Sequence, residues 1–329
     1  KMKRRDLFLT DLGVDSDLEQ SYVMTPENFV KRDVQITNDG VSVSKCDERP
    51  SSLSPKDIQV QRFLGDGFSS KVYLVKHKTL GNIALKEISV MDKQKREQLV
   101  QEIKALYTAR CPCLVKFYGA FYVDTKVKIG IEYMDQGCLG TVLQKFGKLP
   151  ERMVAAVTLQ VVWGLGWLLH AQRVHRDIKP QNILCDSSGQ VKLTDFGVSK
   201  ELDGSIMCCK TLVGTYVYMS PERVSMQNYD FPSDIWSLGL VLVQCLSGRF
   251  PYSTIPIEFY QQLKDAPEPQ APNSCTSQCH AFISMCLQKE PSKRASVQQL
   301  ISSDWLNLFG ATSVEGSQQI VAEFLRSSS

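Results

Sequence analysis

Residues 174–184 read VHRDIKPQNIL, and this stretch decides which kind of fold the chain has. Charged and polar side chains crowd into one turn between apolar flanks, namely His175, Arg176, Asp177, Lys179 and Asn182. The carboxylate of Asp177 can accept a proton, and the amide oxygen of Asn182 is a hard ligand of the kind that Mg²⁺ prefers. Alone, the stretch also fits an ordinary loop that contains an aspartate.

A second acidic loop follows in KLTDFGVSK at residues 192–200. It places Asp195 between the end of a strand and Phe196-Gly197, and it supplies a second oxygen ligand for a divalent cation. Either loop alone has an ordinary structural explanation. Together and in this order, the two loops would rarely arise by chance.

The segment upstream of these loops carries features that would complete such a site. GDGFSSKV places Gly65 and Gly67 after one strand, with Val72 opening the next, and glycine lets a backbone approach phosphate oxygens closely. Lys86 lies in the strand NIALKEISV between apolar neighbours and needs an anionic partner. Glu102, in the amphipathic helix KREQLVQEIKALY, is a candidate partner. Taken singly, these features are more typical of a structural hairpin and a surface salt bridge.

Together the motifs resemble those of eukaryotic protein kinases over about residues 58–310. The resemblance implies that Lys86 holds the α- and β-phosphates of ATP, that Asp177 orients and deprotonates the substrate hydroxyl, and that Lys179 steadies the transferred phosphate. It implies Mg²⁺ as the metal cofactor. The implied metal ligands are Asn182 and Asp195, and the implied ATP-binding residues are Leu64, Gly65, Gly67, Val72, Ala84, Lys86, Glu102, Ile131, Glu132, Met134 and Leu184.

The same resemblance pairs Arg294 with Glu222 and makes Asp234 the anchor of the catalytic loop. One departure is Ser70, which stands where the family has the third glycine of its Gly-rich loop. Serine makes the loop stiffer, but it is small, so we expect no loss of function. Every catalytic position is filled, which argues against a scaffold without turnover.

The expected fold is α+β, that of a bilobal protein kinase with a small β-rich lobe and a larger, mainly helical lobe. A hairpin or extended arm is predicted around Asn38-Asp39-Gly40, because Asn, Asp and Gly favour tight turns between alternating segments. The predicted boundaries are 1–28 for a flexible tail, 29–57 for an extended arm or linker, 58–134 for the N-lobe, 135–310 for the C-lobe and 311–329 for a C-terminal extension.

Within the kinases, the chain is most similar to MAP kinase kinases. GTYVYMSPER at residues 214–223, together with DFGVSKEL, SDIWSLGLVLVQC, GRFPY and CLQKEPSKR, looks like that family. The resemblance implies a dual-specificity enzyme that phosphorylates a MAP kinase on Thr and Tyr. It places the activating phosphosites, which an upstream MAP kinase kinase kinase would modify, at Ser205 and Thr211, with five residues between them as in plant-type members. The alternatives are another Ser/Thr kinase of the STE group and a kinase-fold docking scaffold.

The chain opens with KMKRRDLFL, in which basic residues run into apolar ones. MAP kinase kinases carry a docking peptide of this form, so the resemblance implies a contact with the downstream MAP kinase. Basic side chains would meet an acidic patch, and leucines would fill apolar pockets. The alternative is a solvated basic tail. The docking residues are Lys3, Arg4, Arg5, Leu7 and Leu9.

The composition limits the remaining function classes. A net charge of +3 gives no global field that would point to nucleic acid. The apolar segment MVAAVTLQVVWGLGWLLH contains Gln160 and is better explained as a buried helix than as a membrane span. Eleven scattered cysteines favour a reducing compartment, so we expect the cytoplasm, with the nucleus as a second location. The cluster Cys275, Cys279, His280 and Cys286 has the wrong spacing for a zinc site.

Overall fold

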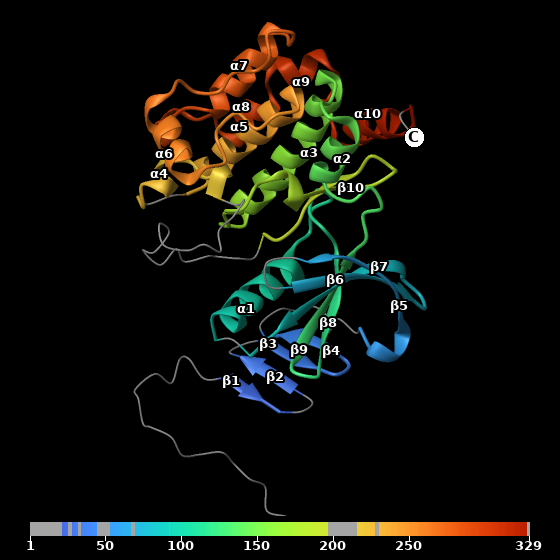
Figure 1. Cartoon of the computed structure of the whole chain (residues 1–329). Coiled ribbons are helices and arrows are strands. Elements are labelled where there is room, and N and C mark those ends of the chain that lie inside the picture. Colours follow the sequence, from blue (N-terminus) through green and yellow to red (C-terminus); the bar gives the residue numbers. More distant parts are fainter. Residues whose placement is uncertain are drawn as a thin grey trace, which may run out of the picture.

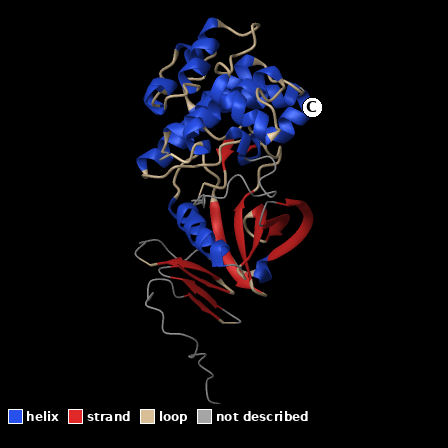
Figure 2. Ribbon diagram, turned by 60° about the vertical axis from the view of Figure 1, so that its left-hand side comes forward, coloured by secondary structure: helices blue, strands red, loops and turns tan. Residues whose placement is uncertain are grey.

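A computed structural model describes residues 22–25, 28–31, 34–44, 53–66, 70–91, 93–196, 216–227 and 230–327. In these residues a sheet-rich lobe and a helical lobe are joined through the segment that follows β9 (Figure 1). Figure 2 shows the same division, with most strands in one half and most helices in the other. The expected two-lobed α+β fold is therefore confirmed.

The N-lobe is built on an antiparallel sheet with strand order β5-β6-β7-β9-β8. Helix α1 (Lys93–Thr108) covers one side of it and buries Leu99, Ile103 and Leu106, the apolar positions at helical spacing. The strands are β5 (Ile58–Asp66), β6 (Ser70–His77), β7 (Gly81–Ser89), β8 (Phe117–Val123) and β9 (Lys126–Glu132).

A second sheet precedes the kinase lobes, and it extends further than the sequence predicted. Its antiparallel strands are β1 (Tyr22–Met24), β2 (Asn28–Lys31), β3 (Val34–Thr37) and β4 (Gly40–Val43). The hairpin of β3 and β4 turns at Asn38-Asp39, as the local turn chemistry indicated. Strand β1, however, begins inside the segment predicted as a flexible tail, so that boundary was wrong.

This sheet is attached to the N-lobe by packing of its apolar face. Val34 and Ile36 are fully buried and alternate with the exposed Gln35, as expected for a strand with one face in a core. The ring of Phe29 lies 6.4 Å from that of Tyr122 in β8. The sheet therefore packs on the outer strand of the N-lobe and shares its core.

The C-lobe is centred on α3 (Glu151–His170), in which every side chain from Met153 to Val162 is buried. Gln160 is satisfied there, because it donates to Gly189 O at 3.1 Å and accepts from Val191 N at 2.9 Å. Among the described residues α3 is the one helix with the length and hydropathy of a membrane span, and 72% of that window is buried inside the fold.

The other C-lobe elements surround α3 and place the catalytic loops at the border with the N-lobe. The C-terminal extension adds a helix that packs along α3. The elements are α2 (Leu139–Phe146), η2 (Pro180–Asn182), β10 (Ile183–Cys185), β11 (Val191–Leu193), η3 (Tyr216–Tyr218), α4 (Pro221–Val224), α5 (Pro232–Ser247), α6 (Pro256–Asp265), α7 (Ser277–Cys286), η4 (Pro291–Lys293), α8 (Val297–Ile301), α9 (Asp304–Leu308) and α10 (Val314–Ser327), and η1 (Pro55–Asp57) precedes β5.

Candidate active site

The catalytic loop between α3 and β10 is fixed through its backbone. Asp234, buried in the first turn of α5, accepts hydrogen bonds from the N–H groups of His175 at 2.7 Å and Arg176 at 2.8 Å. Arg176 has a φ of 69°, in the left-handed region that is costly for a side-chain-bearing residue. Arg223 Nη1 donates to the carbonyl oxygen of Arg176 at 2.7 Å. These bonds hold a strained turn whose next residue is Asp177.

The carboxylate of Asp177 is oriented by two neighbours from the sequence motif. Lys179 Nζ lies 2.9 Å from Asp177 Oδ2, and Asn182 Nδ2 donates to the same oxygen at 2.9 Å and to Asp177 O at 2.8 Å. The side chain of Asp177 keeps 25% of its surface exposed. A carboxylate held this way and open to solvent on one side can receive a proton from a bound hydroxyl.

Lys86 forms ion pairs with one carboxylate from each lobe, Glu102 and Asp195, and we call these two ion pairs the clasp. Its Nζ lies 2.7 Å from Glu102 Oε1 in α1 and 2.8 Å from Asp195 Oδ1 beyond β11. The lysine side chain is only 12% exposed. Burial disfavours its charge, but the two carboxylates outweigh burial and hold its pKa above the usual range. Burial likewise opposes the charge on Asp195, yet Lys86 holds the pKa of that carboxyl below its ordinary value. Both groups are therefore charged at neutral pH.

The residues around Asp195 fit a divalent cation. Asp195 has a φ of 60° and follows Thr194, whose N–H donates to Asn182 O at 3.1 Å, so the two implied ligands are tied together. The amide nitrogen of Asn182 is engaged with Asp177, which leaves its oxygen as the end available to a metal. Two hard oxygens, completed by phosphate and water, are the donor set that Mg²⁺ accepts.

The implied adenine-binding residues come together at the border of the lobes. Val72 pairs with Lys86, and Ala84 pairs with both Leu74 and Ile131 across the sheet. Leu184 in β10 bridges to Cys138. We call residues 132–134, which lead from β9 into the C-lobe, the hinge. Leu64, Val72 and Leu184 remain half-buried, while Ala84, Ile131 and Met134 are buried. Gly65 pairs with Val72, and Gly67 lies outside the described residues.

Glu132 is used differently from the other implied ATP-binding residues. Its carboxylate oxygens lie 2.9 and 2.7 Å from Lys192 Nζ, and Oε2 also accepts from Lys116 N at 3.2 Å. The side chain is thus engaged inside the protein, and so is the main-chain N–H, which donates to Lys116 O at 2.9 Å. Sequence reasoning missed Lys192, although the signal that identified Lys86, a lysine within an apolar strand, applies to it equally.

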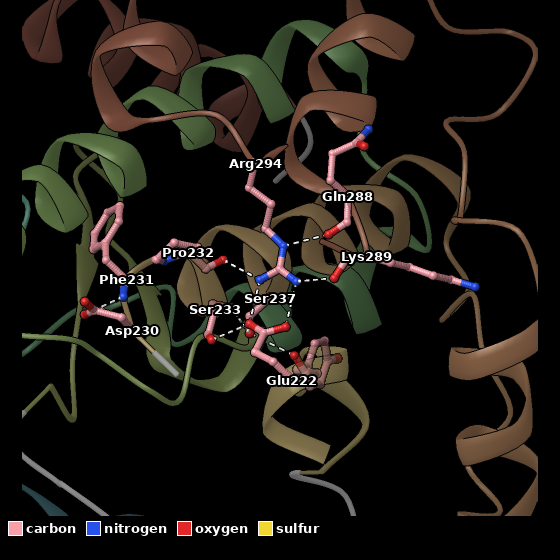
Figure 3. Close-up of polar contacts among 10 residues, drawn as sticks. Glu222, Asp230, Phe231, Pro232, Ser233, Ser237, Gln288, Lys289 and Arg294 are labelled. Carbon is pink, nitrogen blue, oxygen red and sulfur yellow. Dashed lines mark hydrogen bonds and ion pairs between the residues drawn. The ribbon is translucent and has the colours of Figure 1, made fainter. Parts of the chain in front are cut away.

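Beside the catalytic loop, Arg294 and Glu222 form a buried bidentate pair (Figure 3). Arg294 Nη1 and Nη2 lie 2.6 and 2.7 Å from the two carboxylate oxygens, and Ser233 Oγ donates to Glu222 at 2.6 Å. The other guanidinium donors reach the carbonyl oxygens of Pro232, Gln288 and Lys289. Burial opposes the charge on Glu222, but the hydrogen bonds from Arg294 lower its pKa to about 2.

Two sets of predicted residues are not placed. The phosphosites Ser205 and Thr211 and the docking residues Lys3, Arg4, Arg5, Leu7 and Leu9 lie outside the described residues. Of the cysteine-histidine cluster in the C-lobe, Cys279 and Cys286 are buried in α7, and the described residues contain no group of three or more His, Cys, Asp or Glu arranged to hold a metal.

Comparisons with known proteins agree with this geometry. A model of the protein kinase domain matches residues 58–306. The mitogen-activated protein kinase kinase 1 of Arabidopsis thaliana is 38% identical over 316 residues, covering 89% of each chain. The tobacco relative named mitogen-activated protein kinase kinase SIPKK is 38% identical over 85% of each chain. The dual specificity mitogen-activated protein kinase kinase dSOR1 of Drosophila melanogaster is 33% identical over 79% of this chain and 73% of its own.

A kinase-domain match over most of the chain, together with relatives of this identity and coverage, settles the enzyme class. Protein kinases use ATP and a divalent metal ion, for which the clasp of Lys86 and the oxygens of Asn182 and Asp195 are suitably arranged. The chain is a protein kinase and belongs to the mitogen-activated protein kinase kinase family.

Proposed function

We propose that this chain transfers the γ-phosphoryl group of ATP to a threonine and a tyrosine in the activation loop of a MAP kinase. The observation that carries the proposal is the clasp in which Lys86 contacts both Glu102 and Asp195, because it joins α1, β7 and the metal-binding loop in one arrangement. The names of the Dictyostelium and Drosophila relatives, which include the words dual specificity, support the choice of both hydroxyl types.

The chemistry follows from the positions of the charged groups. Lys86 would bind the α- and β-phosphates, and Lys179 would reduce the charge on the γ-phosphoryl group. Asp177 would orient the substrate hydroxyl and accept its proton as the oxygen bonds to the γ-phosphorus. The bond from that phosphorus to the β–γ bridging oxygen breaks, and ADP leaves. Mg²⁺, held by Asn182 and Asp195, would neutralise phosphate charge when bound.

Two further parts of the proposal concern residues outside the described part of the chain. Phosphates on Ser205 and Thr211 would each add about −1.5 to −2 charges and recruit a guanidinium such as that of Arg176, beside the catalytic Asp177. An upstream MAP kinase kinase kinase would add them. The basic-then-apolar segment at residues 1–9 would dock the substrate MAP kinase.

The proposal is tested with catalytically inactive MAP kinases as substrates. The purified chain, after treatment with an active upstream kinase, is incubated with ATP, Mg²⁺ and a panel of these substrates, and the phosphosites are mapped by mass spectrometry. We expect phosphate on both the threonine and the tyrosine of one activation loop. Phosphate on serine or threonine of generic substrates only would favour another STE-group kinase, and no transfer at all would favour a docking scaffold.

The docking segment is tested by variants that separate its two halves. Arg4→Glu with Arg5→Glu removes attraction to an acidic patch, so association should slow and lose salt dependence. Leu7→Ala with Leu9→Ala removes apolar contacts, so dissociation should accelerate with little change in salt dependence. A solvated tail predicts unchanged binding for both pairs.

A further inference from the structure

Lys192 makes a buried ion pair that spans the two lobes at the hinge. It lies in β11, three residues before Asp195, and its side chain is only 7% exposed. Its Nζ contacts both carboxylate oxygens of Glu132, the last residue of β9. One end of this pair therefore stands on the strand that leads to the metal-binding loop, and the other on the segment next to the adenine-binding residues.

A backbone connection runs parallel to the ion pair. We call residues 113–116 the strap. At one end Leu193 N donates to Cys113 O at 2.9 Å, and Val115 N donates to Leu193 O at 3.0 Å. At the other end Glu132 N donates to Lys116 O at 2.9 Å, and Lys116 N donates to the carboxylate of Glu132. The strap is thus bonded to β11 on one side and to the hinge on the other.

These contacts fix the distance between two places where a nucleotide must be held. The N–H of Met134, two residues after Glu132, has no hydrogen-bond partner in the part of the chain that the structure describes, so it is available to a base. Asp195, which would serve the phosphates, lies two residues after the end of β11, the strand that contains Lys192. We infer that Lys192 is a positioning residue for ATP, which holds the hinge main chain in register with Asp195 through Glu132.

Stability alone does not account for a lysine at this place. Desolvating two charges costs about as much as their attraction returns, and apolar residues of similar size often do as well or better. What an ion pair adds is a fixed register, because two carboxylate oxygens and one ammonium group satisfy one another in few arrangements. The backbone hydrogen bonds of the strap do not involve the Lys192 side chain, so they should keep the lobe folded when Lys192 is replaced. The hinge would then lose only the constraint that the ion pair places on Glu132.

The inference rests on the proposed use of ATP and is tested by binding rather than by transfer. Adenine presents an amine donor and a ring-nitrogen acceptor to the hinge, whereas guanine presents the opposite pattern at that edge. A hinge held in register should therefore distinguish ATP from GTP, and a displaced hinge should distinguish them less. The triphosphate, which Lys86 would bind, is common to both nucleotides.

The variants are Lys192→Met, which removes the charge, and Lys192→Arg, which keeps it. Lys126→Met is the control, because it breaks the 2.7 Å ion pair between Lys126 and Glu87 in the N-lobe without touching Glu132 or Lys192. Dissociation constants for ATP and GTP with Mg²⁺ are measured by calorimetry, and melting temperatures are recorded alongside. Glu132→Gln serves as the second variant, because its amide oxygen can still accept from Lys116 N–H while the ammonium group of Lys192 loses its counter-charge.

For Lys192→Met we expect ATP binding to weaken roughly tenfold and GTP binding to weaken much less, so that the preference for ATP shrinks. Lys192→Arg should recover most of the preference, Glu132→Gln should lose part of it, and Lys126→Met should keep it. Equal weakening of both nucleotides, or an unchanged preference in folded Lys192→Met and Glu132→Gln, would overturn the inference. A wild-type chain that binds neither nucleotide would instead overturn the proposed function.

Discussion

Replacing Glu222 with glutamine should cost the protein a large, pH-dependent part of its stability. In the folded state the carboxylate has a pKa of about 2, against an ordinary value of 4.5. That difference corresponds to about 3 kcal/mol of stability at neutral pH. Glu222→Gln removes this contribution and leaves the guanidinium of Arg294 buried without its counter-charge, a type of loss that costs about 3–5 kcal/mol.

The pH dependence has a definite sign. Because the folded pKa lies below the unfolded one, the contribution of Glu222 is complete above about pH 4.5 and is lost as the pH falls toward 2. The wild-type protein should therefore be the more stable at pH 7 by at least about 3 kcal/mol, and its advantage over Glu222→Gln should shrink between pH 4.5 and 3.

Urea unfolding at pH 7, 5, 4 and 3, followed by tryptophan fluorescence, measures this difference. Glu290→Gln is the control, because Glu290 pairs with Lys293 at 2.7 Å on the surface, where both side chains are more than half exposed. We expect no resolvable change for that variant at pH 7. A loss below about 1 kcal/mol for Glu222→Gln, or a difference from wild type that stays constant down to pH 3, would refute the reasoning.

Three other predictions concern the two phosphosites, the N-terminal segment and the packing of α10. Ser205→Ala with Thr211→Ala should block activation by an upstream kinase, and a double variant activated as well as wild type, in a phosphate-transfer assay, would place the switch elsewhere. Deletion of residues 1–9 should raise KM for the MAP kinase while leaving transfer to a generic protein substrate unchanged, and equal KM values would make the segment a solvated tail. Gly189→Ala should lower the melting temperature by several degrees, because its φ is +86° and a Cβ there would meet the carbonyl oxygen of Gln318 in α10; an unchanged melting temperature would contradict the packing of α10.

The contact between Lys86 and Glu102 was predictable because both residues carry chemical signals in the sequence itself. A lysine inside the apolar strand β7 requires an anion, and Glu102 in the amphipathic helix α1 supplies one. The anchoring of the catalytic loop by Asp234 and the pairing of Arg294 with Glu222 came from the family resemblance, and both contacts are present. Periodicity alone would not have joined residues so far apart in the chain.

The parts that were missed depend on long-range partners that no local pattern identifies. Strands β1 and β2 have only three and four residues: β1 pairs with β2, and β2 pairs with β3 and places Phe29 near Tyr122. Helix α10 in the C-terminal extension is placed by its contact with α3. Lys192 was assigned no role from the sequence, because its partner Glu132 lies sixty residues away.

The central claim, that this chain performs phosphoryl transfer through Lys86 and Asp195, is tested most directly by the rate of that step. Phosphate transfer from radiolabelled ATP to a catalytically inactive MAP kinase is compared for wild type, Asp195→Ala and Lys86→Met, all activated in the same way. The account predicts that kcat falls at least about 10³-fold for Asp195→Ala and that transfer is nearly abolished for Lys86→Met, with both variants still folded by circular dichroism. Rates close to wild type in both variants would contradict it.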